Sequence, residues 1–175
     1  MALNIKHMLY LLFAATLAAI FFLKPHQTGR VEKKGVPQIM FIDFRSFEIT
    51  EKGILSVGRG LVAEKFPQFM KIKSPYFKRL TPQGRESIKA KEAVYNEDGT
   101  LLFERSVVLK LEEGWQIDTE KTYFDLKRKV YSTAGLPFTA RYGESVVRGK
   151  NMFYYQKSGK ITADSIKADI ATEDI

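Results

Sequence analysis

Apolar and polar residues alternate along most of the chain after Pro37, with the period of two that is typical of strands. In residues 100–111, TLLFERSVVLKL, the side chains of Leu101, Phe103 and Leu109 fall on one face. No segment of this region carries an apolar stripe of helical period. Turn sequences with glycine recur at residues 51–53, 82–84, 96–99, 112–114, 134–135, 142–143 and 157–159. The pattern predicts an all-β fold of successive antiparallel hairpins.

Three segments share a longer pattern. Residues 88–95, 117–124 and 147–154 each begin with a β-branched residue, have a small residue two places on, and an aromatic residue seven places on. Their starting points are 29 and 30 residues apart, and residues 57–63 resemble a fourth, more divergent copy. A fixed period of this size is typical of stacked units that cover one another's apolar faces. We therefore expect an elongated β-structure.

Each copy contains a break in the alternation. The small residue and the aromatic residue, such as Ala90 and Tyr95, are an odd number of positions apart, so a regular strand would point them to opposite faces. A bulge or a corner between them would return both to the inside, and small residues at a corner let the backbone turn closely. We predict two facing antiparallel sheets, joined at bent corners and extended along one axis.

The amino-terminal region is different. Residues 8–23, MLYLLFAATLAAIFFL, form an uninterrupted apolar run. As a helix this run would cover about 24 Å, slightly less than the ~30 Å hydrocarbon layer of a bilayer, and Lys6 and Lys24 can extend its reach. The alternative is a cleaved signal peptide, but the run ends in bulky residues where a signal peptidase requires small ones. We predict a membrane anchor over residues 1–24, a polar tether over residues 25–36, and one domain over residues 37–175.

Two observations bear on the orientation of this anchor, and they point in opposite directions. Positive charges are more numerous on the carboxyl side of the apolar run, which by the positive-inside rule would place the domain in the cytoplasm. The amino-terminal tail is short, however, and the segment has the character of a signal-anchor. We favour a domain outside the cytoplasm, while the charge count favours the reverse.

The net charge of +8 falls to +6 when the first 26 residues, with Lys6 and Lys24 and no acids, are removed. A basic surface favours phosphates, acidic lipids or nucleic acid, and the alternative is a solvated surface without a specific partner. Aromatic residues are not interleaved with the cations as in nucleic-acid modules, so no nucleic-acid partner is expected. The basic residues that could meet lipid phosphates are Lys71, Lys73, Lys78, Arg79, Arg85, Lys89 and Lys91.

Catalytic motifs are missing from the sequence. The chain has no cysteine, and its only histidines, His7 and His26, flank the apolar run. It contains neither a Gly-x-Ser-x-Gly elbow nor a phosphate-binding loop, and no cluster has the spacing of metal ligands. Asp43 and Glu48 could form a carboxylate pair, but we expect both to face solvent. We predict a protein that is not an enzyme and that holds no cofactor and no metal.

The arrangement resembles the LptC family of lipopolysaccharide-export proteins, within the LptA and OstA-like group. The resemblance covers essentially the whole chain and rests on the amino-terminal apolar run, on residues 140–149 followed by 152–155, and on residues 159–168. It implies an elongated, twisted antiparallel β-jellyroll with one amino-terminal transmembrane helix. The anchor distinguishes this pattern from LptA, whose signal peptide is removed. The implied location is the inner membrane, crossed once, with the bulk domain in the periplasm.

The resemblance also implies a function. The domain would accept lipopolysaccharide from an inner-membrane ABC transporter of the LptB/LptF/LptG type and pass it to a soluble, periplasmic LptA-like jellyroll. Burying an acyl chain gains about 0.8 kcal/mol per CH₂, on the order of 10 kcal/mol for a dozen carbons, so transfer between similar grooves is feasible where release into water is not. The alternatives are a scaffold of an envelope complex that binds no lipid, and an envelope hydrolase, which the missing catalytic residues disfavour.

Two groups of residues are candidates for this function. The end strands, near residues 38–47 and 165–170, are expected to dock edge to edge with other jellyrolls. The residues expected to dock from the second of these strands are Ser165, Ile166, Ala168 and Ile170. The groove is expected to be lined by inward-facing apolar side chains, for which the alternative is packing in a dry core. The predicted groove residues are Phe44, Phe47, Phe77, Phe103, Leu109, Trp115, Ile117, Phe124, Phe138 and Tyr154.

Overall fold

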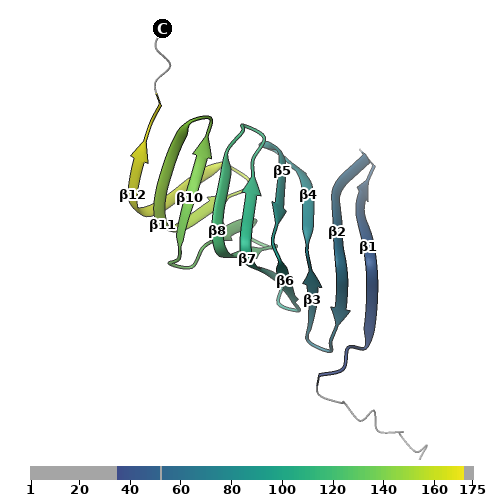
Figure 1. The fold of residues 1–175 in the computed structure, drawn as a ribbon. Coiled ribbons are helices and arrows are strands. Elements are labelled where there is room, and N and C mark those ends of the chain that lie inside the picture. The colour runs from purple at the N-terminus through teal and green to yellow at the C-terminus, as the bar shows by residue number, and fades with distance from the viewer. Residues whose placement is uncertain (1–34, 52, 172–175) are drawn as a thin grey trace, which may run out of the picture. The chain divides into compact units, whose positions relative to one another are not determined.

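The structure is a computed structural model that describes residues 35–51 and 53–171. From Pro37 onward these residues form one β-domain, a single antiparallel sheet of twelve strands (Figure 1). The predicted all-β fold is confirmed. The predicted anchor over residues 1–24 lies outside the described residues, as does most of the tether. No helix in the part that the structure describes is both long and apolar enough to cross a membrane.

The strands follow one another along the chain with short connections. They are β1 (Ile39–Thr50), β2 (Gly53–Lys65), β3 (Phe69–Lys73), β4 (Tyr76–Thr81), β5 (Gly84–Lys89), β6 (Glu92–Asn96), β7 (Thr100–Lys110), β8 (Gln116–Asp125), β9 (Val130–Ser132), β10 (Pro137–Tyr142), β11 (Ser145–Tyr155) and β12 (Lys160–Asp169). The edge strands β1 and β12 each pair with one neighbour, β2 and β11 respectively, among the described strands.

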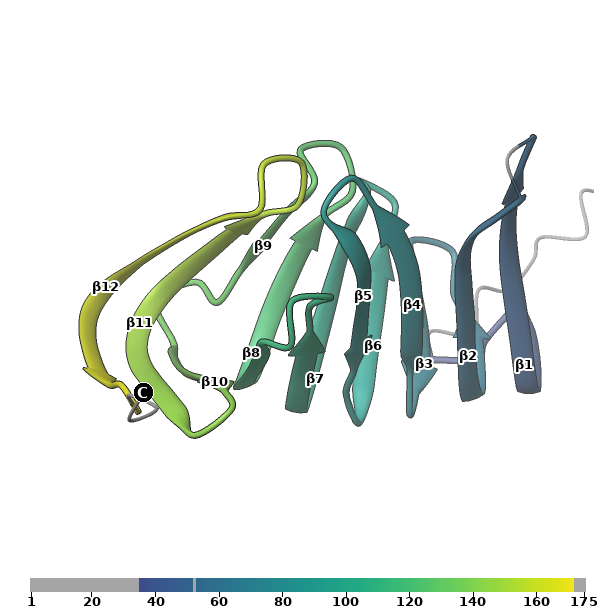
Figure 2. The ribbon, with the colours of Figure 1, turned by 90° about the horizontal axis from the view of Figure 1, so that it is seen from above.

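The sheet is folded into two layers that face each other (Figure 2). The long strands run through both layers: β7, for example, pairs with β6 over Leu101–Glu104 and with β5 over Val108–Lys110. Layer A contains β4, β5 and β10, and layer B contains β3, β6 and β9. Each layer is completed by one half of the long strands β1, β2, β7, β8, β11 and β12.

The chain passes between the layers at a row of corners. Residues with positive φ gather there, because a sharp bend in a strand needs backbone conformations outside the β region. In β7 both Arg105 and Ser106 have positive φ, and the pairing with β8 shifts register between Glu104 and Val107. In β11 the bend is at Asn151, with register shifts on both sides. The other non-glycine residues with positive φ at corners are Asp43, Ser74, Ala134 and Ser165.

The corners explain the odd spacing in the sequence copies. The first positions of the three copies, Ile88, Ile117 and Val147, lie in layer A, and their aromatic residues lie in layer B. In layer A, cross-strand pairing gives one continuous row from β1 to β12: Ser46, Gly58, Phe77, Ile88, Leu109, Ile117, Ala140, Val147 and Ala168. In layer B it gives Met70, Tyr95, Leu101, Phe124, Tyr131, Tyr154 and Ile161. The predicted corner returns the aromatic residue to the inside in two copies, where Phe124 and Tyr154 are buried, whereas Tyr95 in the first copy is 37% exposed.

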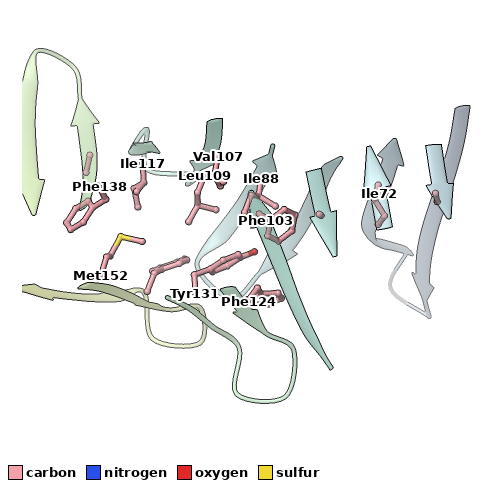
Figure 3. Close-up of a cluster of buried hydrophobic side chains, with 14 residues drawn as sticks. Ile72, Ile88, Phe103, Val107, Leu109, Ile117, Phe124, Tyr131, Phe138 and Met152 are labelled. Carbon is pink, nitrogen blue, oxygen red and sulfur yellow. The ribbon is translucent and has the colours of Figure 1, made fainter. Parts of the chain in front are cut away.

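The core lies between the layers. Figure 3 shows Leu109, Ile117 and Phe138 on one side, and Tyr131, Phe124 and Met152 on the other, pointing toward one another. These side chains belong to one cluster of buried hydrophobic residues that extends from Ala63 in β2 to Tyr154 in β11. At the ends of the strands away from the corners lie the turns 81–84, 110–116 and 142–145 of layer A and the turns 96–100, 125–130 and 155–160 of layer B. We call the side of the domain formed by these turns the mouth.

Candidate functional site

Nine of the ten predicted groove residues contribute to this interior. Three of them, Phe44, Phe77 and Trp115, are partly buried and pack against the core cluster. Fully buried are Phe103, Leu109, Ile117, Phe124, Phe138 and Tyr154. The residues come from six different strands and the β7–β8 turn, so only the folded sheet brings them together.

The prediction for Phe47 is wrong, because its side chain is 56% exposed and does not line the interior. Phe44 and Phe47 are three positions apart on β1, and alternation along a strand directs such residues to opposite faces. Phe44 reaches the core, so Phe47 points outward. Since β1 is an edge strand, several other large apolar side chains on it are also exposed, namely Ile39, Met40, Phe41, Ile42 and Ile49.

Aromatic rings make up much of the interior surface of layer B. The ring of Tyr131 stacks on Phe124 with centroids 4.2 Å apart and on Tyr154 at 6.0 Å. Across the two layers, Phe77 meets Phe103 edge to face at 5.9 Å. Such rings present broad, rigid apolar faces. They make the inner side of layer B largely apolar.

A cavity of about 190 Å³ lies within this interior. It is bordered by both layers, with Phe77 and Ile88 on one side and Phe103, Phe124 and Tyr131 on the other. An engineered cavity of about 150 Å³ in another protein holds one benzene molecule. The cavity therefore has room for a short stretch of an acyl chain, and a whole chain of a dozen carbons requires the layers to separate.

One charged side chain is buried beside this cavity. Glu86 on β5 is 5% exposed, and its Oε1 accepts hydrogen bonds from the hydroxyl of Tyr131, at 3.1 Å, and from the amide of Gln156. Burial raises the pKa of Glu86 above its ordinary value, and these two hydrogen bonds oppose the rise. Burial also raises the pKa of the Tyr131 hydroxyl and takes that of Tyr154 to about 12, so both phenols are neutral.

The Glu86 cluster joins the two layers near the mouth. Glu86 belongs to layer A, whereas Tyr131 and Gln156 belong to layer B and the turn that follows it. A second bridge lies farther out, where the side-chain amide of Gln83 donates to the carbonyl of Lys157 at 3.2 Å. Sequence reasoning did not find these contacts, because Glu86 is 45 residues from Tyr131 and 70 from Gln156.

Asp43 and Glu48 are both exposed, as expected, and they do not form a carboxylate pair. Asp43 is an exposed corner residue, while the carboxylate of Glu48 accepts hydrogen bonds from Arg79 and, at 2.8 Å, from Ser56. The hydrogen bond from Arg79 is the main reason that the pKa of Glu48 is lowered. Within residues 35–51 and 53–171, no three His, Cys, Asp or Glu side chains are placed to hold a metal ion.

The predicted basic neighbourhood is divided between different parts of the fold. Lys71 and Lys73 are on β3 in layer B, where the ammonium of Lys71 lies 5.8 Å from the centre of the Phe69 ring. Arg79 is engaged by Glu48. The exposed cations of β4 and β5 are Lys78, Arg85 and Lys89, and they remain candidates for contact with phosphates.

Both ends of the sheet carry exposed apolar side chains. On β12 these include Ile161 and Ile166, at 40% and 59% exposure, and Ile170 follows the strand at 63%. Ser165 forms the corner of β12, and Ala168 ends the apolar row of layer A. An edge strand with unused backbone groups and apolar side chains can accept another strand. The two predicted end segments are thus the two edges of the sheet.

The comparison with known families agrees with this architecture. The family model described as "Lipopolysaccharide-assembly, LptC-related" matches residues 8–165 of the 175-residue chain. A search of the curated proteins found no match. The family match covers the predicted anchor and all of the β-domain up to the corner of β12. On this basis, the chain belongs to the LptC-related family of lipopolysaccharide-assembly proteins.

Proposed function

We propose that this protein carries lipopolysaccharide between two neighbouring proteins, with the acyl chains held between layers A and B and the saccharide outside the mouth. Membership of the family supports a role in lipopolysaccharide transport. The observation that carries the finer proposal is the pair of largely apolar rows that cross the domain, one from Ser46 in β1 to Ala168 in β12 and the other from Met70 in β3 to Ile161 in β12. An apolar track that reaches both edges can continue into a second domain of the same kind.

The energetics favour such a continuous track. Moving a chain of a dozen carbons from an apolar interior into water costs on the order of 10 kcal/mol. Sliding it into a similar interior next to it changes its exposure little, so gains and losses nearly cancel. Net transport of the lipid in one direction then requires an energy source, and we assign this role to an ATP-driven transporter in the inner membrane.

The edges supply the means of joining. We propose that β1 and β12 each add to an edge strand of a neighbouring jellyroll, with Ser165, Ile166, Ala168 and Ile170 on the second of these docking edges. Strand addition provides main-chain hydrogen bonds, and the exposed isoleucines of β12 add apolar contacts. The neighbours would be the transporter at one edge and a soluble LptA-like jellyroll at the other.

The amino-terminal run completes the proposal. Residues 8–23 would cross the inner membrane once, residues 25–36 would serve as a tether, and the domain of residues 37–175 would lie in the periplasm. A tethered domain stays close to the transporter, which raises its effective concentration there. The run's length and apolar sequence support this assignment.

Site-specific photo-crosslinking during ATP-driven export tests the proposal. A photo-reactive phenylalanine analogue at Phe103 or Trp115 should capture lipopolysaccharide, because both side chains pack in the interior. The same analogue at Lys110, an exposed position on the strand that carries Phe103, is the matched control. Labelling at Lys110 alone would contradict lipid transport through the interior. Partner binding without any lipid labelling would favour the scaffold function instead.

A further inference from the structure

Glu86 has a carboxyl oxygen without a partner. Its Oε1 receives both hydrogen bonds, from Tyr131 and Gln156, whereas Oε2 is buried and has no hydrogen-bond partner in the part of the chain that the structure describes. Buried polar atoms are nearly always hydrogen-bonded, because an unsatisfied one forfeits its hydration. The lining of the adjoining cavity is largely apolar and includes Arg79 among its few polar side chains, but none of them bonds to Oε2. The free oxygen is therefore available to a ligand.

The position of Glu86 indicates which part of a ligand would meet it. The residue lines the 190 Å³ cavity and also a second, smaller space formed by turns at the mouth, which includes Gln83 and Gly159. It thus stands between the apolar interior and solvent. A lipid with its acyl chain inside and its head group outside places the head end of the chain at this level.

The chemistry of the carboxyl group suits a hydrogen bond to a neutral group. Burial raises the pKa of Glu86, whereas its two hydrogen bonds and the charges of Arg79 and Lys129 oppose the rise. The free oxygen can accept a hydrogen bond whether or not the carboxyl group is protonated. With Oε1 occupied, Oε2 can bond a hydroxyl or an amide near the head end of the chain. Apolar walls scarcely distinguish an acyl chain that bears a hydroxyl from one that lacks it, whereas a site built to bond the hydroxyl does.

We propose that Glu86 is a specificity-determining residue of the interior, and that its Oε2 binds a hydroxyl or amide group near the head end of an acyl chain. The proposal rests on the lipid-carrying function and narrows its substrate to acyl chains with such a group. Tyr131 and Gln156 act as positioning residues, because their hydrogen bonds hold Oε1 and leave Oε2 free for the ligand.

Competition binding tests the proposal. Three probes of equal chain length, methyl 3-hydroxytetradecanoate, N-methyl tetradecanamide and methyl tetradecanoate, would displace a fluorescent fatty-acyl ester from the full-length protein in detergent micelles. The wild-type protein should bind the hydroxyl and amide probes about tenfold more tightly than the plain ester, the value of one good hydrogen bond. Glu86→Leu should abolish that preference while it still binds the ester. Glu86→Gln, which retains a donor and an acceptor, should keep part of it.

Thr122→Val is the matched control. Thr122 is also a buried polar residue, at 2% exposure, but it does not line the cavity and its hydroxyl already donates to Ser132. This variant should keep the tenfold preference. Equal binding of all three probes by the wild-type protein, or an unchanged preference in Glu86→Leu, would overturn the proposal while leaving lipid transport intact. Failure of every probe to bind would instead count against the lipid-carrying function itself.

Discussion

Replacement of Phe103 by alanine measures how firmly the interior holds the two layers together. The Phe103 side chain is 1% exposed and meets Phe77 edge to face. Replacing a phenylalanine that is buried in this way by alanine lowers the free energy of unfolding by about 3–5 kcal/mol. Phe103 also borders a cavity that already exists, so its loss enlarges an open space that cannot readily collapse. We therefore expect a destabilisation of about 4 kcal/mol, in the upper half of that range.

The single tryptophan makes this measurement specific to the β-domain. Trp115 is partly buried and lies 5.3 Å from the Tyr142 ring, so its fluorescence reports unfolding of the domain in the full-length protein. With a urea dependence of about 2 kcal/mol per molar, 4 kcal/mol lowers the midpoint by about 2 M.

Phe47→Ala provides the comparison, since it removes the same side chain from an exposed position and should change the stability by less than about 0.5 kcal/mol. Equal urea midpoints for the two variants would refute the conclusion that burial of Phe103 stabilises the domain.

Three further predictions address pH, loading and docking. Burial raises the pKa of Glu86 in the folded protein above its ordinary value of 4.5. The stability that Glu86 contributes in its protonated form is therefore fully present below pH 4.5 and is lost as the pH rises through the pKa of the folded state. Glu86→Gln should therefore match the wild type near pH 4 and exceed it at pH 8 in urea unfolding, and a constant difference would contradict this sign. A short bifunctional thiol crosslinker between Gln83→Cys and Lys157→Cys, the two positions that the 3.2 Å hydrogen bond joins, should hold the mouth closed and reduce lipid crosslinking at Phe103 at least severalfold relative to the protein without the crosslinker. Undiminished crosslinking would show that the layers need not separate. Truncation before Ser165 should weaken binding to an LptA-like jellyroll by tenfold or more in a pull-down titration while changing the urea midpoint much less, and unchanged binding would contradict edge docking.

Several features of the fold could be predicted because they depend on neighbours in sequence. Alternation of apolar and polar residues predicted the all-β class. The odd spacing between Gly149 and Tyr154 predicted a corner, which the structure places at Asn151. The 29- and 30-residue period gave units that stack, and their equivalent residues now lie in the same cross-strand rows. Both edges were also located, because the first and last strands of a stacked sheet have a neighbour on one side.

The exposure of Phe47 and the Glu86 cluster were not predicted, for different reasons. Phe47 is aromatic and lies in a strand, and only the bend at Asp43 and the pairing with β2 decide which of the β1 side chains face the core. The burial of Glu86 depends on Tyr131 and Gln156, which approach it from the opposite layer. No local pattern marks a glutamate as one that will meet partners so distant in the chain.

The sequence by itself determined the strands, their corners, the stacking of repeated units and the membership of a lipopolysaccharide-assembly family, because each of these is set by side-chain spacing within about 30 residues. The tertiary structure alone decided the size of the cavity, the contacts that close the mouth and the burial of a carboxyl oxygen of Glu86 without a hydrogen-bond partner among the described residues. These properties depend on the distance between two layers, and that distance is fixed only when side chains from both of them pack against each other.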